Sequence, residues 1–138
     1  MAIVPVMADT VPLSAAWRTD TGLVRGHNED FVKVYEPATE DERRRHGAVY
    51  IVADGVGGAD AGEVASEYAS EQTLQHYLAA DGRADWGKRL IDAMQAANTD
   101  LRRLAAGRDD SRRMATTMVA VVIQDGHAYI GNVGDSRA

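Results

Sequence analysis

The sequence predicts an α+β fold, with helices packed against a sheet, and three observations support this class. An apolar, β-branched run at 48–54 is typical of a strand. Two long segments between 63 and 104 repeat apolar residues at three- and four-residue steps, as amphipathic helices do. Two further apolar runs flank the dipeptide Asp125-Gly126, which favours a two-residue hairpin turn.

The remaining elements follow in chain order. Residues 1–12 have the composition of a flexible leader, and residues 13–138 form one domain. Short strands are expected at 13–22 and 31–37, and the charged segment 38–47 is expected to be a solvated turn. The predicted order is therefore β-β-β-α-α-β-β.

The hairpin turn also predicts a register. It pairs Gln124 with His127 and, further along the strands, places Thr116 opposite Asp135. The first strand of the hairpin is apolar on both faces, so we expect it to be central and covered on both sides.

Composition excludes several classes of function. The net charge of −6 argues against a nucleic-acid binder, which normally carries a basic patch. The chain has no cysteine, so thiolate metal sites and disulfides are excluded and a reducing compartment is favoured. No window approaches the roughly 20 apolar residues of a membrane helix, and no basic signal-peptide start is present. We expect a cytoplasmic protein without membrane or nucleic-acid partners.

Asp54 stands where a buried strand opens into a glycine-rich turn, "DGVGG". A buried carboxylate needs a cation or strong donors, and glycines allow positive φ and a close approach of the backbone. Carboxylate and carbonyl oxygens together suit Mg²⁺ or Mn²⁺. The alternative is an ordinary Asp-Gly turn without a ligand. The phosphate-binding P-loop lacks its Lys-Ser/Thr here, and the dinucleotide motif fails because Asp60 stands where it needs glycine.

Two further clusters carry acids near strand ends. In "RGHNED", Arg25 accompanies Glu29 and Asp30; a guanidinium can grip phosphate, although a plain charged turn is the alternative. In "GNVGDSRA", Asp135 follows an apolar strand, and Thr116 and Thr117 are expected to donate hydrogen bonds to it. The four histidines are scattered without zinc spacing.

Four motifs occur in order: R-x-x-x-E-D at 25–30, D-G-x-G-G-x-x-x-G-x-x-A-S at 54–66, T-T at 116–117 and G-D-S-R at 134–137. Together they resemble the metal-dependent serine/threonine protein phosphatases of the 2C type, the bacterial members most closely. The resemblance spans roughly residues 14–138. It implies a four-layer α/β/β/α sandwich with a metal site at one end, of which this chain forms an N-terminal part that is incomplete at the C-terminus.

The resemblance also implies the roles of residues. Asp54 would bridge two Mn²⁺ or Mg²⁺ ions, and the Gly55 carbonyl would bind one of them. Glu29 would act through metal-bound water with Asp30 near the site, and Asp135 would help to hold a third metal.

The implied activity is hydrolysis of phosphoserine and phosphothreonine esters in protein substrates. Arg25 would hold the substrate phosphate while metal-activated water attacks phosphorus. Some eukaryotic relatives carry a histidine, a proposed general acid, at the position of Val56, so another donor would protonate the leaving group here.

Two further metal-binding aspartates of the family, in S-D-G and D-N motifs, do not occur in this sequence. We therefore expect a truncated phosphatase fragment with incomplete sheets that self-associates, binds metal weakly and is inactive alone. The alternative is a non-catalytic, phosphatase-like binding or regulatory module.

Overall fold

The computed structural model describes residues 13–57, 60–80, 85–108 and 114–138. Along these residues the elements are β1 (Asp30–Tyr35), α1 (Glu40–His46), β2 (Ala48–Val56), α2 (Asp60–Ala79), α3 (Trp86–Ala106), β3 (Ala115–Thr116), β4 (Met118–Gln124) and β5 (His127–Val133). The predicted α+β class is confirmed, with one helix more and a different first strand than expected. The expected leader at 1–12 lies outside the described residues.

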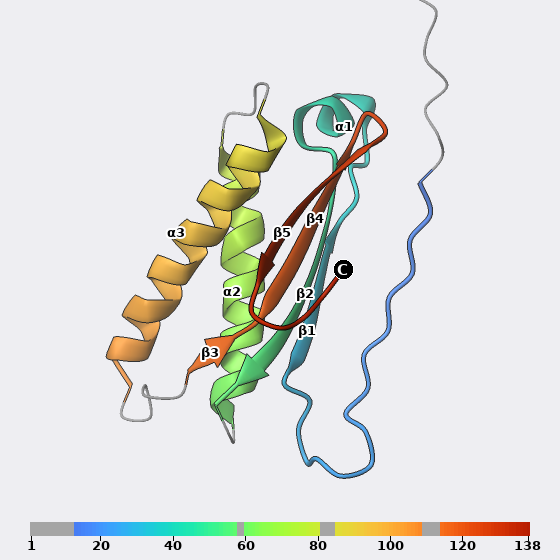
Figure 1. Ribbon diagram of the computed structural model, residues 1–138. Coiled ribbons are helices and arrows are strands. Elements are labelled where there is room, and N and C mark those ends of the chain that lie inside the picture. Colours follow the sequence, from blue (N-terminus) through green and yellow to red (C-terminus); the bar gives the residue numbers. More distant parts are fainter. Residues whose placement is uncertain (1–12, 58–59, 81–84, 109–113) are drawn as a thin grey trace, which may run out of the picture.

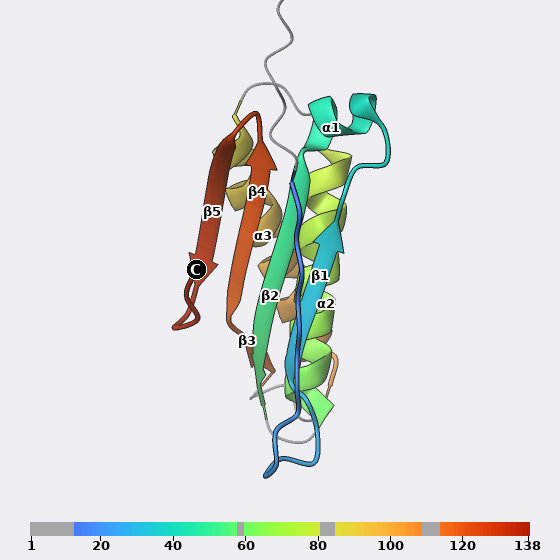
Figure 2. The same ribbon diagram turned by 90° about the vertical axis from the view of Figure 1, so that its right-hand side faces the viewer.

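The sheet is antiparallel throughout, with the strand order β1-β2-β4-β5 and the short β3 paired to the end of β2. Both long helices lie on one face of this sheet (Figure 1). Turned by 90°, the molecule presents the opposite face, with β5, β4, β2 and β1 side by side in that order (Figure 2). The described chain therefore forms two layers, helices and sheet.

The hydrophobic core lies between these two layers. The helices supply small side chains and a few large ones, and the sheet supplies every second residue of its central strands, as the period of a strand requires. The fully buried members of the cluster include Val49, Ile51, Ala65, Tyr77, Leu90, Ala120 and Val122. Both predicted helices are confirmed as the cover of one sheet face. The apolar stripe of α3 is its buried side, whereas α2 buries mainly small residues such as Ala65 and Ser66.

The other face of the sheet is apolar as well. The side chains that alternate with the buried ones are Val32, Val34, Tyr50, Val52, Val119, Val121, Ile123 and Ile130. Val52 is 49% exposed and Ile130 is 59% exposed. The prediction that the strand 118–124 is central is confirmed, but no helix of the described chain covers its second face (Figure 2). This apolar sheet surface is called the open face below.

The expected strand at 13–22 is wrong. These residues run across the view of the open face without joining the sheet, and Trp17 is 59% exposed (Figure 2). A side-chain hydrogen bond connects them to the next segment, from Asn28 Nδ2 to Thr19 Oγ1 at 2.7 Å. A strand requires a partner backbone, and the composition of the segment gave no information about that partner.

The segment 38–47 is also not a turn, because it contains α1. Thr39 caps this helix: its hydroxyl accepts from the Glu42 N–H, and the Glu42 carboxylate accepts from the Thr39 N–H. This reciprocal arrangement is a capping box, for which T-x-x-E is the sequence signature. The signature was present in the sequence, but the run of charges obscured it.

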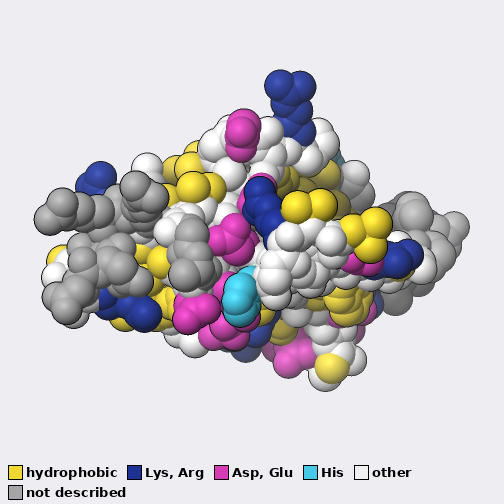
Figure 3. All heavy atoms as spheres, turned by 90° about the horizontal axis from the view of Figure 1, so that it is seen from below, with side chains coloured by type: hydrophobic (Ala, Val, Ile, Leu, Met, Phe, Trp, Pro, Cys, Tyr) yellow, Lys and Arg dark blue, Asp and Glu magenta, His cyan; other side chains and the backbone are white. Residues whose placement is uncertain are grey.

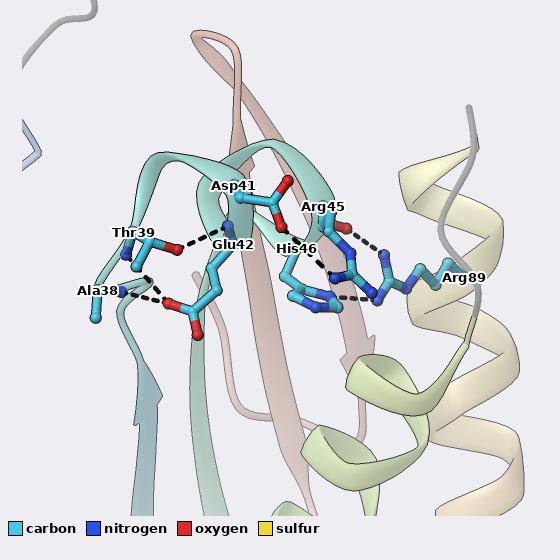
Figure 4. A network of polar contacts seen from close by, with 7 residues as sticks. All are labelled: Ala38, Thr39, Asp41, Glu42, Arg45, His46 and Arg89. Carbon is cyan, nitrogen blue, oxygen red and sulfur yellow. Dashed lines mark hydrogen bonds and ion pairs between the residues drawn. The ribbon is translucent and has the colours of Figure 1, made fainter.

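A buried arginine ties α1 to α3 (Figure 4). The Arg89 guanidinium donates to the carbonyl oxygens of Tyr77 and Arg45 at 2.7 and 2.8 Å, and its third nitrogen lies 2.8 Å from His46 Nδ1. It also stacks on the Tyr77 ring at 4.1 Å. Burial and the adjacent Arg89 charge lower the pKa of His46. The cluster holds the end of the sheet that is opposite to the acids described below.

The hairpin is confirmed at its turn and corrected at its far end. Asp125 and Gly126 both have positive φ, and Gln124 pairs with His127 as predicted. Thr116, however, pairs with Gly55 of β2 and not with Asp135. The ladder between β4 and β5 ends at Met118, because Thr117 leaves the strand and the chain crosses to β2.

In the described segments, no helix is long and apolar enough to span a bilayer.

Candidate active site

Asp30 and Asp54 lie opposite each other at one end of the sheet. They form the last paired position of β1 and β2, and this antiparallel register places both side chains on the open face. Burial, followed by the nearby Asp54 carboxyl, raises the pKa of Asp30. Two carboxyl groups that compete for one place favour either a shared proton or a cation between them.

The backbone of Asp54 is held by the two threonines that precede β4. The Asp54 N–H donates to Thr117 Oγ1 at 3.2 Å, and the Asp54 carbonyl accepts from the Thr117 N–H at 2.9 Å. Thr116 Oγ1 also donates to this carbonyl, at 3.1 Å. The threonines therefore position Asp54, whereas the sequence interpretation had them donate to Asp135.

Gly55 lacks a side chain because β2 and α2 approach each other closely there. A Cβ at Gly55 would lie 1.9 Å from the Gly62 carbonyl oxygen, far inside contact distance. Gly55 does not have the positive φ that the glycine-rich sequence suggested. β2 also continues through Asp54 to Val56, two residues beyond the predicted end of the strand. Position 55 therefore requires glycine because the backbones of β2 and α2 lie so close together, and not because a turn there needs positive φ.

Glu29 and Arg25 form an ion pair in the segment before β1. Arg25 Nη1 lies 3.2 Å from Glu29 Oε2, and the Arg25 side chain is 70% exposed while that of Glu29 is only 15% exposed. The Glu29 backbone carbonyl accepts from the Gly55 N–H at 2.9 Å and from the Ser66 hydroxyl at 2.6 Å. Glu29 is thus fixed against β2 and α2, and its arginine partner extends toward solvent.

Asp135 follows β5 in a bend on the same end of the sheet. Its neighbours contact Thr117: the Ser136 hydroxyl lies 2.6 Å from Thr117 Oγ1, and a Cβ on Gly134 would lie 2.9 Å from Thr117 Cγ2. Gly134 has φ of +95°, which favours glycine. The bend is therefore connected to Asp54 by way of Thr117. Asp135 itself makes no hydrogen bond to another described residue.

Seen from this end, acidic side chains lie beside an arginine or lysine side chain, with apolar side chains nearby (Figure 3). Across residues 13–57, 60–80, 85–108 and 114–138, no group of three or more His, Cys, Asp or Glu side chains is arranged to hold a metal ion. Asp30 and Asp54 therefore form a carboxylate pair with Glu29 nearby. A metal ion that is enclosed by protein ligands alone would require more ligands than these.

A separate cavity of about 740 Å³ lies on the helix side of the sheet. Its described lining is mostly apolar, with residues such as Ile91, Met94, Leu101, Met118 and Val133, and no acidic side chain occurs among these described residues. It reaches Thr116 but not Asp30 or Asp54. The cavity and the acidic side chains therefore lie in different places. Because only the acids could bind a cation, we take the acidic end of the sheet as the candidate site.

Sequence reasoning did not assign roles to two residues of this site, Gly62 and Ser66. A Cβ on Gly62 would lie 2.5 Å from Glu29 Oε1, so this glycine makes room for the carboxylate. Ser66 is 1% exposed and donates to the Glu29 carbonyl. The signal available was the small residues of G-x-x-x-G-x-x-A-S at the start of a helix, which indicate close backbone packing.

Comparison with known proteins identifies a family that matches most of the chain. The protein phosphatase 2C family model matches residues 27–138. The serine/threonine phosphatase stp of Listeria monocytogenes is 35% identical over 131 residues, which cover 91% of this chain and 48% of the relative. The chain thus spans about half the length of the curated relatives it matches first.

Solved structures agree with the fold. The Mycobacterium tuberculosis serine/threonine phosphatase PstP/Ppp superposes with a TM-score of 0.68 at 33% identity, over 87% of this chain and 46% of that one. The catalytic domain of PstP in complex with two manganese ions gives the same TM-score and identity, over 87% and 47%. The helix and sheet layers described above are therefore part of the fold of these phosphatases, and the chain belongs to the protein phosphatase 2C family.

Proposed function

We propose that the chain carries the N-terminal part of a metal-dependent site that hydrolyses phosphoserine and phosphothreonine esters in proteins. The observation that carries the proposal is the opposition of Asp30 and Asp54 at the end of the sheet, next to an arginine that reaches solvent. Family membership supplies the reaction class, since the relatives are named serine/threonine phosphatases.

The donor set fits Mn²⁺ or Mg²⁺. Asp54 and the Gly55 carbonyl would hold the ions. Glu29 would contribute through water, with Asp30 beside the site. Hard oxygen ligands of this kind suit these cations. A bound cation would also offset the repulsion between the Asp30 and Asp54 carboxyl groups, which contributes to the raised pKa of Asp30. The ions, when bound, would supply the Lewis acidity that activates water for attack on phosphorus.

Arg25 would bind the phosphate of the substrate. Its exposed guanidinium can present two parallel N–H donors to phosphate oxygens, which is the geometry in which arginine binds phosphate. The ion pair with Glu29 holds the exposed Arg25 guanidinium 3.2 Å from the Glu29 carboxylate, beside the proposed site. Thr117 would hold Asp54 in place through its two contacts with the Asp54 backbone.

Asp135 would help to hold a third ion. Support comes from the bend that contains it, since Ser136 and Gly134 on either side pack against Thr117, which in turn binds Asp54. The polypeptide of 138 residues would bind metal weakly and have little phosphatase activity alone, because its described acids do not form a group of three.

Phosphopeptide binding tests this proposal without requiring turnover. We expect a phosphothreonine peptide to bind the chain more tightly with Mn²⁺ than with EDTA, and more tightly than its unphosphorylated form. Arg25→Met should abolish the preference for the phosphorylated peptide, and Asp54→Asn should abolish the effect of Mn²⁺. Absence of Mn²⁺ binding to the wild-type chain would contradict the proposed site, and rapid Mn²⁺-dependent hydrolysis of p-nitrophenyl phosphate would contradict its inactivity alone.

The second candidate function is a non-catalytic module that binds phosphoprotein or a regulatory partner. The small number of clustered acids among the described residues favours it for this polypeptide. It predicts that phosphopeptide binding depends on Arg25 but is the same in Mn²⁺ and in EDTA. The same titration therefore separates the two candidates.

The chain would also associate with itself through the open face, since exposed Val52 and Ile130 lie on an apolar sheet surface. Its partners would be phosphoproteins in the cytoplasm and not nucleic acid or membrane.

A further inference from the structure

One backbone oxygen receives hydrogen bonds from two different elements at the acidic end. The Glu29 carbonyl lies 2.6 Å from the Ser66 hydroxyl of α2 and 2.9 Å from the Gly55 nitrogen of β2. Ser66 is 1% exposed, so water does not compete for this contact. The Ser66 hydroxyl is also 3.1 Å from the Glu63 carbonyl in its own helix, but the contact with Glu29 is the shorter. This oxygen joins α2, β2 and the segment that leads into β1.

The side chain of Glu29 is confined as well. The space at Gly62 accommodates Glu29 Oε1, which a Cβ at that position would approach to 2.5 Å. Arg25 pairs with the other carboxylate oxygen. Because Asp30 is the next residue, the orientation of the peptide between Glu29 and Asp30 also determines where the Asp30 carboxyl lies relative to Asp54.

A second serine in the same helix shows that the contact is specific. Ser70, one turn after Ser66, is completely buried, yet its hydroxyl has no hydrogen-bond partner among the described residues. Helix packing alone thus accepts a serine without a partner. The bond from Ser66 to Glu29 is a separate feature, which links the first turns of α2 to the acids.

We propose that Ser66 is a positioning residue for metal binding. It acts through the Glu29 carbonyl, and it fixes the Glu29–Asp30 peptide so that both carboxyl groups meet Asp54 in the arrangement that a divalent cation needs. Groups that hydrogen-bond to a metal ligand typically contribute 10- to 100-fold to metal affinity, and Ser66, which acts through the Glu29 backbone, is expected at the lower end of this range. The inference rests on the proposed function, since positioning has a purpose only if these acids bind metal.

The test compares Ser66→Ala and Ser66→Cys with the control Ser70→Ala in the full 138-residue chain. Cysteine is close to serine in size and is a weaker donor, so Ser66→Cys keeps the packing if alanine does not fold. The Mn²⁺ dissociation constant is measured from free Mn²⁺ by electron paramagnetic resonance on folded protein. We expect Ser66→Ala to weaken binding about tenfold, Ser66→Cys to lie between it and the wild type, and Ser70→Ala to match the wild type.

Amide hydrogen exchange of Gly55 in EDTA supplies a readout that does not depend on metal. We expect faster exchange in Ser66→Ala than in Ser70→Ala, because the Gly55 N–H shares its acceptor with Ser66. If Ser66→Ala lowers stability but leaves both Mn²⁺ affinity and Gly55 exchange like those of Ser70→Ala, Ser66 has only a packing role and the proposal is wrong. If the wild type binds no Mn²⁺, the proposed function fails and the positioning role fails with it, whereas wild-type binding with unchanged variants overturns the positioning role alone.

Discussion

Asp54 lies directly across from Asp30 in the antiparallel pair of β1 and β2, so two carboxyl groups share one cross-strand position. Like charges placed this way destabilise a sheet. Burial and the Asp54 carboxyl raise the pKa of Asp30, so the folded chain holds the Asp30 proton more strongly than the unfolded chain does. Such an arrangement lowers stability at the place where we propose that a cation binds.

The first prediction concerns this pair. Because the folded pKa of Asp30 is raised, the contribution of Asp30 to stability is present at low pH and is lost as pH rises through that value. Asp30→Asn should therefore stabilise the metal-free chain at pH 7 by roughly 0.5 kcal/mol. Urea unfolding in EDTA measures this effect. Glu67→Gln, at an exposed position in the middle of α2, is the control and should change little. Destabilisation by Asp30→Asn would show that the acids do not repel each other.

The second prediction concerns the contact between β2 and α2. Gly55→Ala would place a Cβ 1.9 Å from the Gly62 carbonyl oxygen and 2.9 Å from that of Glu29, and both are backbone atoms that cannot rotate away. We expect a loss of at least about 3 kcal/mol in unfolding free energy. Gly26→Ala, which meets no atom within 4 Å, should be close to neutral. Equal effects of the two substitutions would contradict the close approach.

The third prediction concerns acid sensitivity at the opposite end of the sheet. His46 faces Arg89 of α3, Arg45, Asp41 and Glu42 of its own helix, and the ring of Tyr35 in β1. Burial and Arg89 lower the folded pKa of His46 below its ordinary 6.5, so the unfolded chain takes up the proton first as pH falls. Stability should therefore decrease from about pH 6.5 downward.

A substitution separates this histidine from other acid effects. His46→Gln keeps a hydrogen-bond acceptor for Arg89 but cannot take up a proton, so the slope of stability against pH between 7 and 5 should become shallower. Thermal unfolding followed by circular dichroism across this range provides the measurement. His127→Gln, at an exposed position on the edge strand β5, should keep the wild-type slope. An unchanged slope in His46→Gln would remove His46 as the cause.

The fourth prediction concerns the open face. We expect the wild-type chain to form dimers or larger species at micromolar concentration by light scattering, and Ile130→Lys to shift it toward the monomer because a charge would have to be buried. Ile91→Lys is the matched control, with a similar exposure of 53%, but it lies on α3 on the other side of the sheet. A monomeric wild type would contradict self-association. A stronger effect of Ile91→Lys would assign it to the helix side.

Local sequence patterns predicted the parts of this fold that depend on local physics. Asp125-Gly126 specifies its turn because few dipeptides accept positive φ at both positions, and the buried side of α3 follows from its apolar spacing. The position of Asp54 at the end of the sheet followed from one strand and its glycines. These inferences required no knowledge of a partner element.

The errors arose where the outcome depends on a distant partner. Residues 13–22 have a strand-like composition but join no strand, and Thr116 pairs with Gly55 because the chain crosses from the hairpin to β2 after Thr117. The two threonines therefore hold Asp54 and not Asp135. The capping box of α1 is different, because T-x-x-E was readable from the sequence and was outweighed by the charges around it.

The bonds between Asp54 and Thr117 have a consequence for how the protein folds. They join residues that are 63 positions apart, and both long helices lie between them in the chain. Closing so long a loop is entropically costly, so contacts of this kind form slowly compared with helices and hairpins. During synthesis, the α2–α3 pair can assemble before Thr117 has left the ribosome. The acidic end would then be the last region to become ordered, and a chain interrupted before β4 would carry both acids without a defined site.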